Sequence, residues 1–200
     1  MTDLSLDPNT TALVLIDLQM GIVGQPLSPH SGTDVIAKAA SLADRFRELK
    51  SPVILVRVAP SADGKDMLKL QTDTQFQMRG PRPANWTELA PEIGPRDGDI
   101  LIVKRQWGAF YGTDLDLQLR RRGVKTIVLG GIATNFGVES TARDAYERGY
   151  EQIFVEDAMS SLTPEAHSFV IQNIFGRMGR VRSAEEVLEA LSQTASCPQQ

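Results

Sequence analysis

The stretch 126–149, TIVLGGIATNFGVESTARDAYERG, decides the fold. It opens with an apolar strand at 126–129, passes through Gly130 and Gly131, and continues into a helix. Apolar or small residues recur in that helix at helical spacing, at Phe136, Ala142, Ala145 and Tyr146. A strand, a glycine pair and a helix in this order place the turn at the carboxyl edge of a parallel sheet, where open α/β folds bind ligands. The sequence therefore predicts a binding site at this turn.

The residues of the turn also have a plain structural interpretation. Gly130 and Gly131 allow strand and helix to pack closely, and Thr134 or Asn135 can cap the helix. The first amide N–H groups of the helix point at the turn, which makes it suited to stabilise an anion. For the turn taken alone, both interpretations stay open.

Five further apolar runs predict the remaining strands, at 12–16, 53–58, 100–103, 152–155 and 179–181. Helical patterns lie between them, within 30–50, from about 113, over 164–175 and from Ser183 to 191. This alternation predicts an α/β fold: a doubly wound, mainly parallel six-stranded sheet with helices on both faces, in a Rossmann-like arrangement. We expect one domain at 1–192 and a polar, disordered tail at 193–200. The irregular segment 59–95 is expected to form a lid or one wall of the site.

The composition narrows the classes of function. A net charge of −4 at pH 7 gives no general attraction to nucleic acid or to anionic membranes. Residues 1–10 carry no basic leader, and no apolar run is long enough to span a bilayer, so we expect a cytoplasmic protein without membrane partners. Its partners are then small molecules or copies of itself. The only cysteine, Cys197, lies in the tail, which argues against disulfides and a buried cysteine nucleophile.

Charged residues follow two of the predicted strands directly. Asp17 ends the first strand, with Gln19 close behind it, and Lys104 follows the third strand. Aromatic residues lie beside Lys104, at Trp107, Phe110 and Tyr111. As plain alternatives, Asp17 caps the next segment, Lys104 is a solvated strand end and the aromatic residues belong to the core. Because the carboxyl ends of parallel strands share an edge, we expect Asp17, Lys104 and the turn to meet there.

The chemistry of such a group depends on a balance at Asp17. A nearby lysine favours the ionised carboxylate, whereas burial favours the protonated acid, so the balance decides whether Asp17 is a base or an acid. Backbone N–H groups of the turn can stabilise a developing oxyanion by about 3–4 kcal/mol per donor. A nucleophile is missing, because the turn carries Gly137 where a Cys, Ser or Thr would be needed.

Three motifs carry a family resemblance: LVLIDLQ at 13–19, VKRQWGAFYGTDL at 103–115 and GGIATNFGVESTARDAYERGY at 130–150. Together they resemble the isochorismatase-like hydrolase superfamily, also called the cysteine hydrolases, over residues 10–191. The resemblance implies that Asp17 and Lys104 are members of a catalytic triad. It also implies an oxyanion hole from the amides of Ala133 and Gly137, with a non-proline cis peptide between Ile132 and Ala133.

One departure from the family pattern matters for the chemistry. In the nicotinamidases and N-carbamoyl amidohydrolases of the superfamily, the third triad member is a cysteine at the position of Gly137. True isochorismatases are similar to this chain in carrying glycine there. The resemblance to these enzymes implies hydrolysis of a vinyl ether without a covalent intermediate. In that reaction the aspartate protonates the enol carbon and a lysine binds or orients the anionic substrate. By contrast, Ala133, Thr134 and Asn135 resemble the amidohydrolase branch.

We therefore predict an isochorismatase-like hydrolase that acts on a small anionic metabolite by non-covalent acid–base chemistry. The expected catalytic residues are Asp17 and Lys104, and the substrate-binding residues are Gln19, Trp107, Phe110, Tyr111, Thr134 and Asn135. Two alternatives stay open: a catalytically silent ligand-binding member, and an amide hydrolase with a non-cysteine mechanism.

No cofactor and no metal are expected. The nicotinamidases carry a histidine-rich metal site after the second strand, whereas this chain has only His30 and His167. Ligation by carboxylates alone stays open. The resemblance further implies a homo-oligomer, a dimer or a tetramer.

Overall fold

Six strands pair into one sheet in the order β3-β2-β1-β4-β5-β6. The computed structural model describes residues 4–74 and 83–195. The strands are β1 (Thr11–Ile16), β2 (Val53–Val58), β3 (Ile100–Lys104), β4 (Thr126–Ile132), β5 (Glu151–Ser160) and β6 (Arg180–Arg182). All pairings in the described sheet are parallel. The predicted six-stranded α/β sheet is confirmed, and it is wholly rather than mainly parallel.

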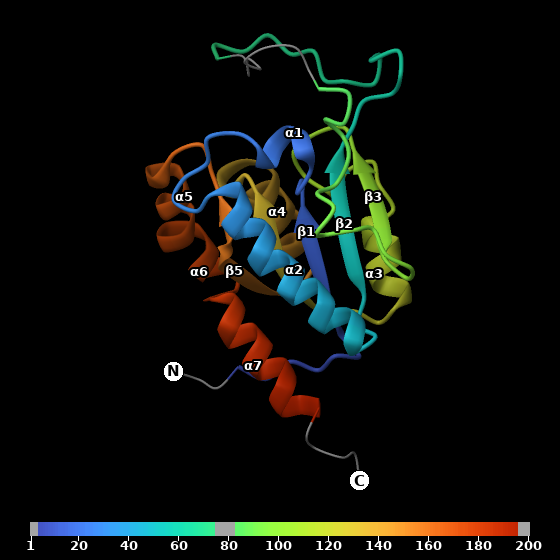
Figure 1. Ribbon diagram of the computed structural model, residues 1–200, viewed down its shortest axis with the longest axis vertical. Helices are drawn as coiled ribbons and strands as arrows, with labels where there is room; N and C mark the ends of the chain where they lie inside the picture. The colour runs from blue at the N-terminus through green and yellow to red at the C-terminus, as the bar shows by residue number, and fades with distance from the viewer. Residues whose placement is uncertain (1–3, 75–82, 196–200) are drawn as a thin grey trace.

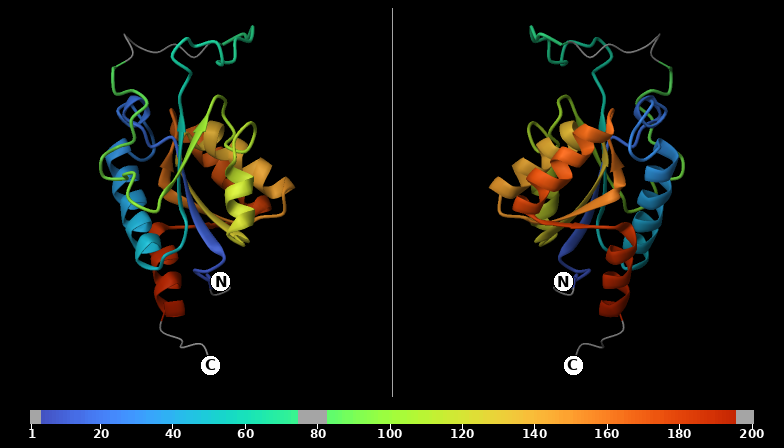
Figure 2. Two further views of the ribbon diagram at one scale, coloured as in Figure 1. Left: turned by 90° about the vertical axis from the view of Figure 1, so that its right-hand side faces the viewer. Right: turned by 90° about the vertical axis from the view of Figure 1, so that its left-hand side faces the viewer.

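Helices cover both faces of the sheet, as Figure 2 shows edge-on. They are α1 (Met20–Val23), α2 (Gly32–Glu48), α3 (Leu115–Arg121), the π-helical turn η1 (Thr134–Val138), α4 (Glu139–Glu147), α5 (Pro164–Val170), the π-helical turn η2 (Ile171–Phe175), α6 (Gly176–Met178) and α7 (Ala184–Ala195). Buried residues of α2 and α7 share one hydrophobic cluster, and those of α3, α4 and α5 share the other. The sheet is therefore doubly wound (Figure 1).

The two clusters explain why the central strand reads as an unbroken apolar run. Leu13 and Leu15 of β1 pack in the cluster with α2, whereas Val14 and Ile16 pack in the cluster with α3 and α4. Successive side chains of a strand point to opposite faces, and both faces of this sheet are buried. Every residue of β1 is consequently buried.

Three expected boundaries differ from the structure. β5 was expected over 152–155, but it continues past the charged pair Glu156 and Asp157 to Ser160, after a shift in its register with β4. The helix after β4 begins with the wider turn η1, and no capping bond from Thr134 or Asn135 is found there in the described chain. α7 runs to Ala195, past the boundary expected at 192, and the remaining tail residues 196–200 lie outside the described residues.

The carboxyl ends of the strands point toward the end of the molecule that carries α1 (Figure 1). Residues after the gap at 75–82 are tied to this end, since Met20 N–H donates to the Glu88 carbonyl and Ala90 N–H to the Leu18 carbonyl. Residues 88–90 of the segment 59–95 thus lie against the edge where a site is expected. No helix among the described residues is both long enough and apolar enough to cross a membrane.

Candidate active site

Asp17 and Lys104 meet at the carboxyl edge of the sheet. Asp17 follows β1 and Lys104 is the last residue of β3, and the Lys104 Nζ lies 2.7 Å from the Asp17 Oδ2. Both are buried, with 5% of Asp17 and 2% of Lys104 exposed. Asp17 has a φ of 54°, in the left-handed region that aspartate and asparagine tolerate better than most residues. The plain alternative of a solvated lysine at a strand end is wrong.

Lys104 uses all three of its N–H donors inside the protein. Besides Asp17, its Nζ donates to the Trp107 carbonyl at 2.8 Å and to the Gln106 carbonyl at 3.1 Å. An ammonium group has three donors and no acceptor, so none is left for a substrate in this arrangement. In this arrangement the Lys104 ammonium is bonded to Asp17 and to two backbone carbonyls, and the substrate-binding role implied by the resemblance stays a prediction.

The two carboxylate oxygens of Asp17 differ in their hydrogen bonding. Asp17 Oδ1 is buried and has no hydrogen-bond partner among the described residues. Burial raises the pKa of Asp17 to about 6, although the Lys104 charge and its hydrogen bond lower that pKa. Burial thus outweighs the lysine, and a carboxyl with a pKa near neutrality can both give and take a proton.

Gly137 lies directly against this pair. A Cβ atom built on Gly137 would lie 3.2 Å from the Asp17 Oδ2 and 3.4 Å from the Lys104 Nζ. The same atom would lie 3.1 Å from the Ile16 Cγ2, which is tighter than an ordinary contact. A side chain at 137 would therefore point at the Asp17 and Lys104 groups, and the glycine leaves that place without a nucleophile.

Gly131 holds β1 and β4 close together just before the turn. Its φ is +124°, and an added Cβ would lie 2.1 Å from the Ile16 carbonyl oxygen. Only glycine fits such an approach of two backbones. The peptide between Ile132 and Ala133 is cis, as expected, and the turn η1 follows at once.

Thr134 forms a buried link that the sequence did not reveal. Its hydroxyl lies 3.1 Å from the Ser160 carbonyl and 2.8 Å from the Nδ1 of His167, a residue of α5. The next residue, Asn135, accepts a hydrogen bond from the Ser161 hydroxyl. Both polar side chains expected to bind substrate are thus bonded to protein groups. Neighbouring His30 and Glu156 join His167 in a cluster of three side chains of types that can ligate a metal.

The buried side chain of Gln19 links three segments by hydrogen bonds. Its amide N–H groups donate to the Val58 and Trp86 carbonyls, and its oxygen accepts from the Val58 N–H. The side chain is fully buried. These bonds fix the end of β2 and residue 86 to the end of β1, and the expected role of Gln19 in substrate binding stays a prediction.

The three aromatic residues beside Lys104 lie in different places. Phe110 is buried in the core, with its ring 6.0 Å from that of Tyr150, and its expected contact with substrate stays a prediction. Trp107 is 63% exposed and packs edge-on against Phe136 of the turn η1, with ring centres 5.0 Å apart. Tyr111 is 76% exposed. Of these three residues, Trp107 makes a ring contact with the turn η1.

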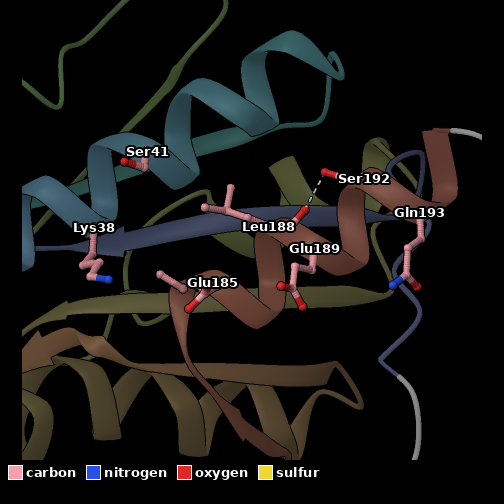
Figure 3. A pocket seen from close by; sticks show the side chains of 8 residues that line it. Lys38, Ser41, Glu185, Leu188, Glu189, Ser192 and Gln193 are labelled. Carbon is pink, nitrogen blue, oxygen red and sulfur yellow. Dashed lines mark hydrogen bonds between the residues drawn. The ribbon is translucent and has the colours of Figure 1, made fainter.

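A hollow of about 680 Å³ lies elsewhere, between α2 and α7 (Figure 3). Lys38 and Ser41 of α2 line it together with Glu185 and Leu188 of α7, and the labelled side chains spread along two helices rather than converging. Asp17, Lys104 and Gly137 are not part of its lining. The paired charges, not this hollow, define the candidate site.

A parallel doubly wound sheet with a buried acid–lysine pair at its carboxyl edge is typical of α/β proteins that bind small molecules at that edge. Residues 11–186 match the family described as "Isochorismatase domain", and the chain belongs to this family. The family assignment agrees with the resemblance carried by the three sequence motifs.

Individual relatives cover nearly the whole chain. The uncharacterized isochorismatase family protein YwoC of Bacillus subtilis is 54% identical over 94% of this chain and 98% of its own. The structure of an isochorismatase family protein from Burkholderia thailandensis is similar with a TM-score of 0.88 and 49% identity, over 94% of this chain and 98% of that one. The ureidoacrylate amidohydrolase RutB of Methylobacterium radiotolerans is 33% identical, over 92% of this chain and 82% of its own.

Proposed function

We propose that this isochorismatase-family protein hydrolyses a small anionic metabolite of the vinyl-ether type, without a covalent intermediate. Asp17 is the proton donor and Lys104 is its electrostatic partner. The Ala133 and Gly137 amides hold negative charge on the substrate, and Trp107 forms part of the wall. Isochorismate, an enolpyruvyl ether, is the first substrate to test.

Asp17 and Lys104 take part in this mechanism as follows. The protonated Asp17 gives its proton to the terminal enol carbon, which leaves an oxocarbenium ion at the ether carbon. Water adds to that carbon and loses a proton to the Asp17 carboxylate, and the resulting hemiketal breaks into pyruvate and an alcohol. Between the two proton transfers, Lys104 stabilises the Asp17 carboxylate, since its Nζ lies 2.7 Å from the Asp17 Oδ2.

The observation that carries the proposal is the combination of an unpartnered acid oxygen and an empty nucleophile position. Asp17 Oδ1 has no partner among the described residues, and Gly137 offers no attacking atom beside it. A protonated carboxyl needs one oxygen free to carry its hydrogen, and the raised pKa of Asp17 makes that form accessible. A covalent acyl-enzyme route lacks its nucleophile.

Amide hydrolysis is the second candidate, favoured by the likeness to the ureidoacrylate amidohydrolase. In that case the ionised Asp17 would act as a base toward water, and the turn amides would stabilise the tetrahedral oxyanion. The two candidates assign opposite protonation states to the active Asp17. A silent ligand-binding member would turn over neither substrate.

The test is release of pyruvate from isochorismate by the purified chain, with Asp17→Asn measured alongside. Asn keeps the size and the backbone preference of the residue but removes the transferable proton. We expect release to fall by at least about a hundredfold in Asp17→Asn. Asp97→Asn, the same change at an exposed residue, should keep full activity.

Pyruvate release that is unchanged in Asp17→Asn would overturn the assigned role of Asp17. Absence of release from isochorismate, together with Asp17-dependent hydrolysis of ureidoacrylate, would move the function to the amide candidate. Absence of both activities in a folded chain would favour the silent binding protein.

A further inference from the structure

Both histidines of the chain come together at one place, although they lie far apart in the sequence. His30 precedes α2 and His167 lies in α5, and their rings pack edge-on with centres 5.7 Å apart. Glu156 of β5 completes the group. One ligand atom from each of the three residues lies within 4.8 Å of those of the other two.

The hydrogen bonds of Thr134 fix the tautomer of His167. The Thr134 hydroxyl has one hydrogen, and the Ser160 carbonyl at 3.1 Å can only accept it. Both contacts are satisfied if His167 donates its Nδ1–H to the Thr134 oxygen, 2.8 Å away. The Nε2 of His167 then carries a lone pair and no hydrogen.

That lone pair faces another acceptor. His167 Nε2 lies 3.8 Å from the Glu156 Oε2, is buried, and has no hydrogen-bond partner among the described residues. His167 itself is only 3% exposed. The Nε2 lone pair and the Glu156 carboxylate oxygen are both acceptors, so they repel each other unless a cation or a hydrogen-bond donor lies between them.

Hydrogen bonds hold the loop that carries His30 against the end of β5. The Ser160 hydroxyl donates to the His30 carbonyl at 2.6 Å. Ser28 and Ser161 exchange backbone hydrogen bonds of 2.9 and 3.1 Å, which fasten the loop before α2 to the end of β5. The side chains of His30 and Glu156 are partly exposed, so they can rotate inward while His167 stays fixed.

We propose that His30, Glu156 and His167 bind one divalent transition-metal ion of the zinc type. Ligand atoms around a tetrahedral zinc lie roughly 3.3 Å apart, so the cluster needs only a small contraction. Two imidazoles and one carboxylate suit zinc and its neighbours better than magnesium or calcium, which prefer oxygen ligands. The absence of metal expected from the sequence is thereby revised.

The ion would stabilise the catalytic turn rather than take part in the reaction. It would fix His167, and His167 holds Thr134, the first residue of η1. Gly137 lies in the same turn. The three ligands are therefore positioning residues for the turn, in the way that outer hydrogen bonds orient metal-bound histidines.

Zinc binding is measured on the full, untagged chain in a Cys197→Ser background, so that the only thiol of the chain contributes nothing. The protein is stripped with a chelator, desalted and titrated with Zn²⁺ in competition with a chromophoric chelator. We expect one Zn²⁺ per chain. Glu156→Gln and His30→Gln should each weaken binding at least about tenfold.

Glu165→Gln is the matched control, because it makes the same change at an exposed residue in the first turn of α5. Its affinity should equal that of the parent chain. Co²⁺ loaded at one equivalent should give the visible absorption of a four-coordinate nitrogen and oxygen site, and this absorption should be lost in Glu156→Gln. Thermal unfolding of each apo variant confirms that the chain is folded.

Absence of stoichiometric zinc binding would overturn the proposal and leave a water or a proton between His167 and Glu156. Binding that is equally tight in Glu156→Gln and His30→Gln would also overturn it. Neither result depends on the substrate, so the metal site and the proposed hydrolysis can fail separately.

Discussion

Two opposing influences set the pKa of Asp17: its burial away from water and the charge of Lys104. Burial disfavours its charge and Lys104 favours it, and the result is a pKa raised to about 6. The sequence predicted both residues and their meeting, but not which influence is stronger. That depends on the depth of burial and on the Gln106 and Trp107 carbonyls, which share the Lys104 ammonium.

The pH dependence of turnover should reveal the role of Asp17. If the protonated acid is the active form, kcat/KM should be level below pH 6 and fall about tenfold per pH unit above it. The sign follows because the fraction of protonated Asp17 decreases as pH rises through its pKa. Steady-state rates between pH 5 and 8 give this profile, and a rise through pH 6 would instead assign Asp17 as a base.

A cysteine at position 137 should be a reactive thiol. In a Cys197→Ser background, Gly137→Cys places its Cβ beside the Lys104 Nζ, whose charge favours the thiolate. We expect alkylation by iodoacetamide at pH 6.5 several times faster than that of Gly176→Cys, an exposed thiol in α6. The tight contact with Ile16 should cost about 1–2 kcal/mol of stability.

An unreactive thiol in folded Gly137→Cys would contradict the account, because the pair and the turn would then not form a working site. Mass spectrometry after timed alkylation follows both variants.

Elements at the carboxyl edge depend on close packing that the sequence indicates only in part. The glycine pair predicted a close approach, and Gly131 indeed meets the backbone of β1. The end of β5 was misjudged because Glu156 and Asp157 are a common ending for a strand, whereas here the chain shifts register and pairs again with β4. The expected capping role of Thr134 was wrong, since a π-helical turn and a distant histidine engage it.

Gly131→Ala should be far more destabilising than Gly149→Ala. Both positions have positive φ, +124° and +77°, so both substitutions meet backbone strain and the same change in the unfolded chain. Only at Gly131 does the added Cβ collide with Ile16, while no described atom lies within 4 Å of it at Gly149. In urea unfolding we expect Gly131→Ala to lower the free energy of unfolding by about 3 kcal/mol or more, and Gly149→Ala by about 1 kcal/mol. Equal losses would refute the close contact of β1 and β4.

Gln19→Met should lower stability rather than substrate affinity. The change keeps the length of the side chain but removes its hydrogen bonds to the half-buried Val58 backbone and to the Trp86 carbonyl. We expect a loss of about 2–4 kcal/mol in urea unfolding, with KM unchanged in the folded fraction. Unchanged stability with a raised KM would restore Gln19 as a substrate-binding residue.

At the scale of the whole molecule, the sequence predicted the sheet class well because both of its faces are buried. Buried strands read as continuous apolar runs, and alternation with helices implies parallel pairing. The convergence of His30 and His167 could not be predicted, since it depends on how α5 and the loop before α2 reach β5 in space. No periodic pattern marks that contact.

The chain should assemble into a dimer or a tetramer. Large apolar side chains are exposed at Met67, Leu68 and Leu70, and also at Leu101 and Val103 of the edge strand β3. Exposed apolar side chains on an edge strand and an extended segment are typical of contact surfaces. Light scattering coupled to size exclusion measures the mass, and a particle with the mass of one chain at micromolar concentration would contradict this expectation.

We propose that burial makes Asp17 a proton donor, and the titration of Asp17 itself tests this role without any substrate. The carboxyl carbon resonance of Asp17 is identified as the ¹³C signal that disappears in Asp17→Asn, and it is followed from pH 3 to 8. We expect a midpoint near 6, well above the ordinary aspartate value of about 3.9. A midpoint at or below about 4 would mean that Lys104 outweighs burial, and the proton-donor mechanism would be contradicted.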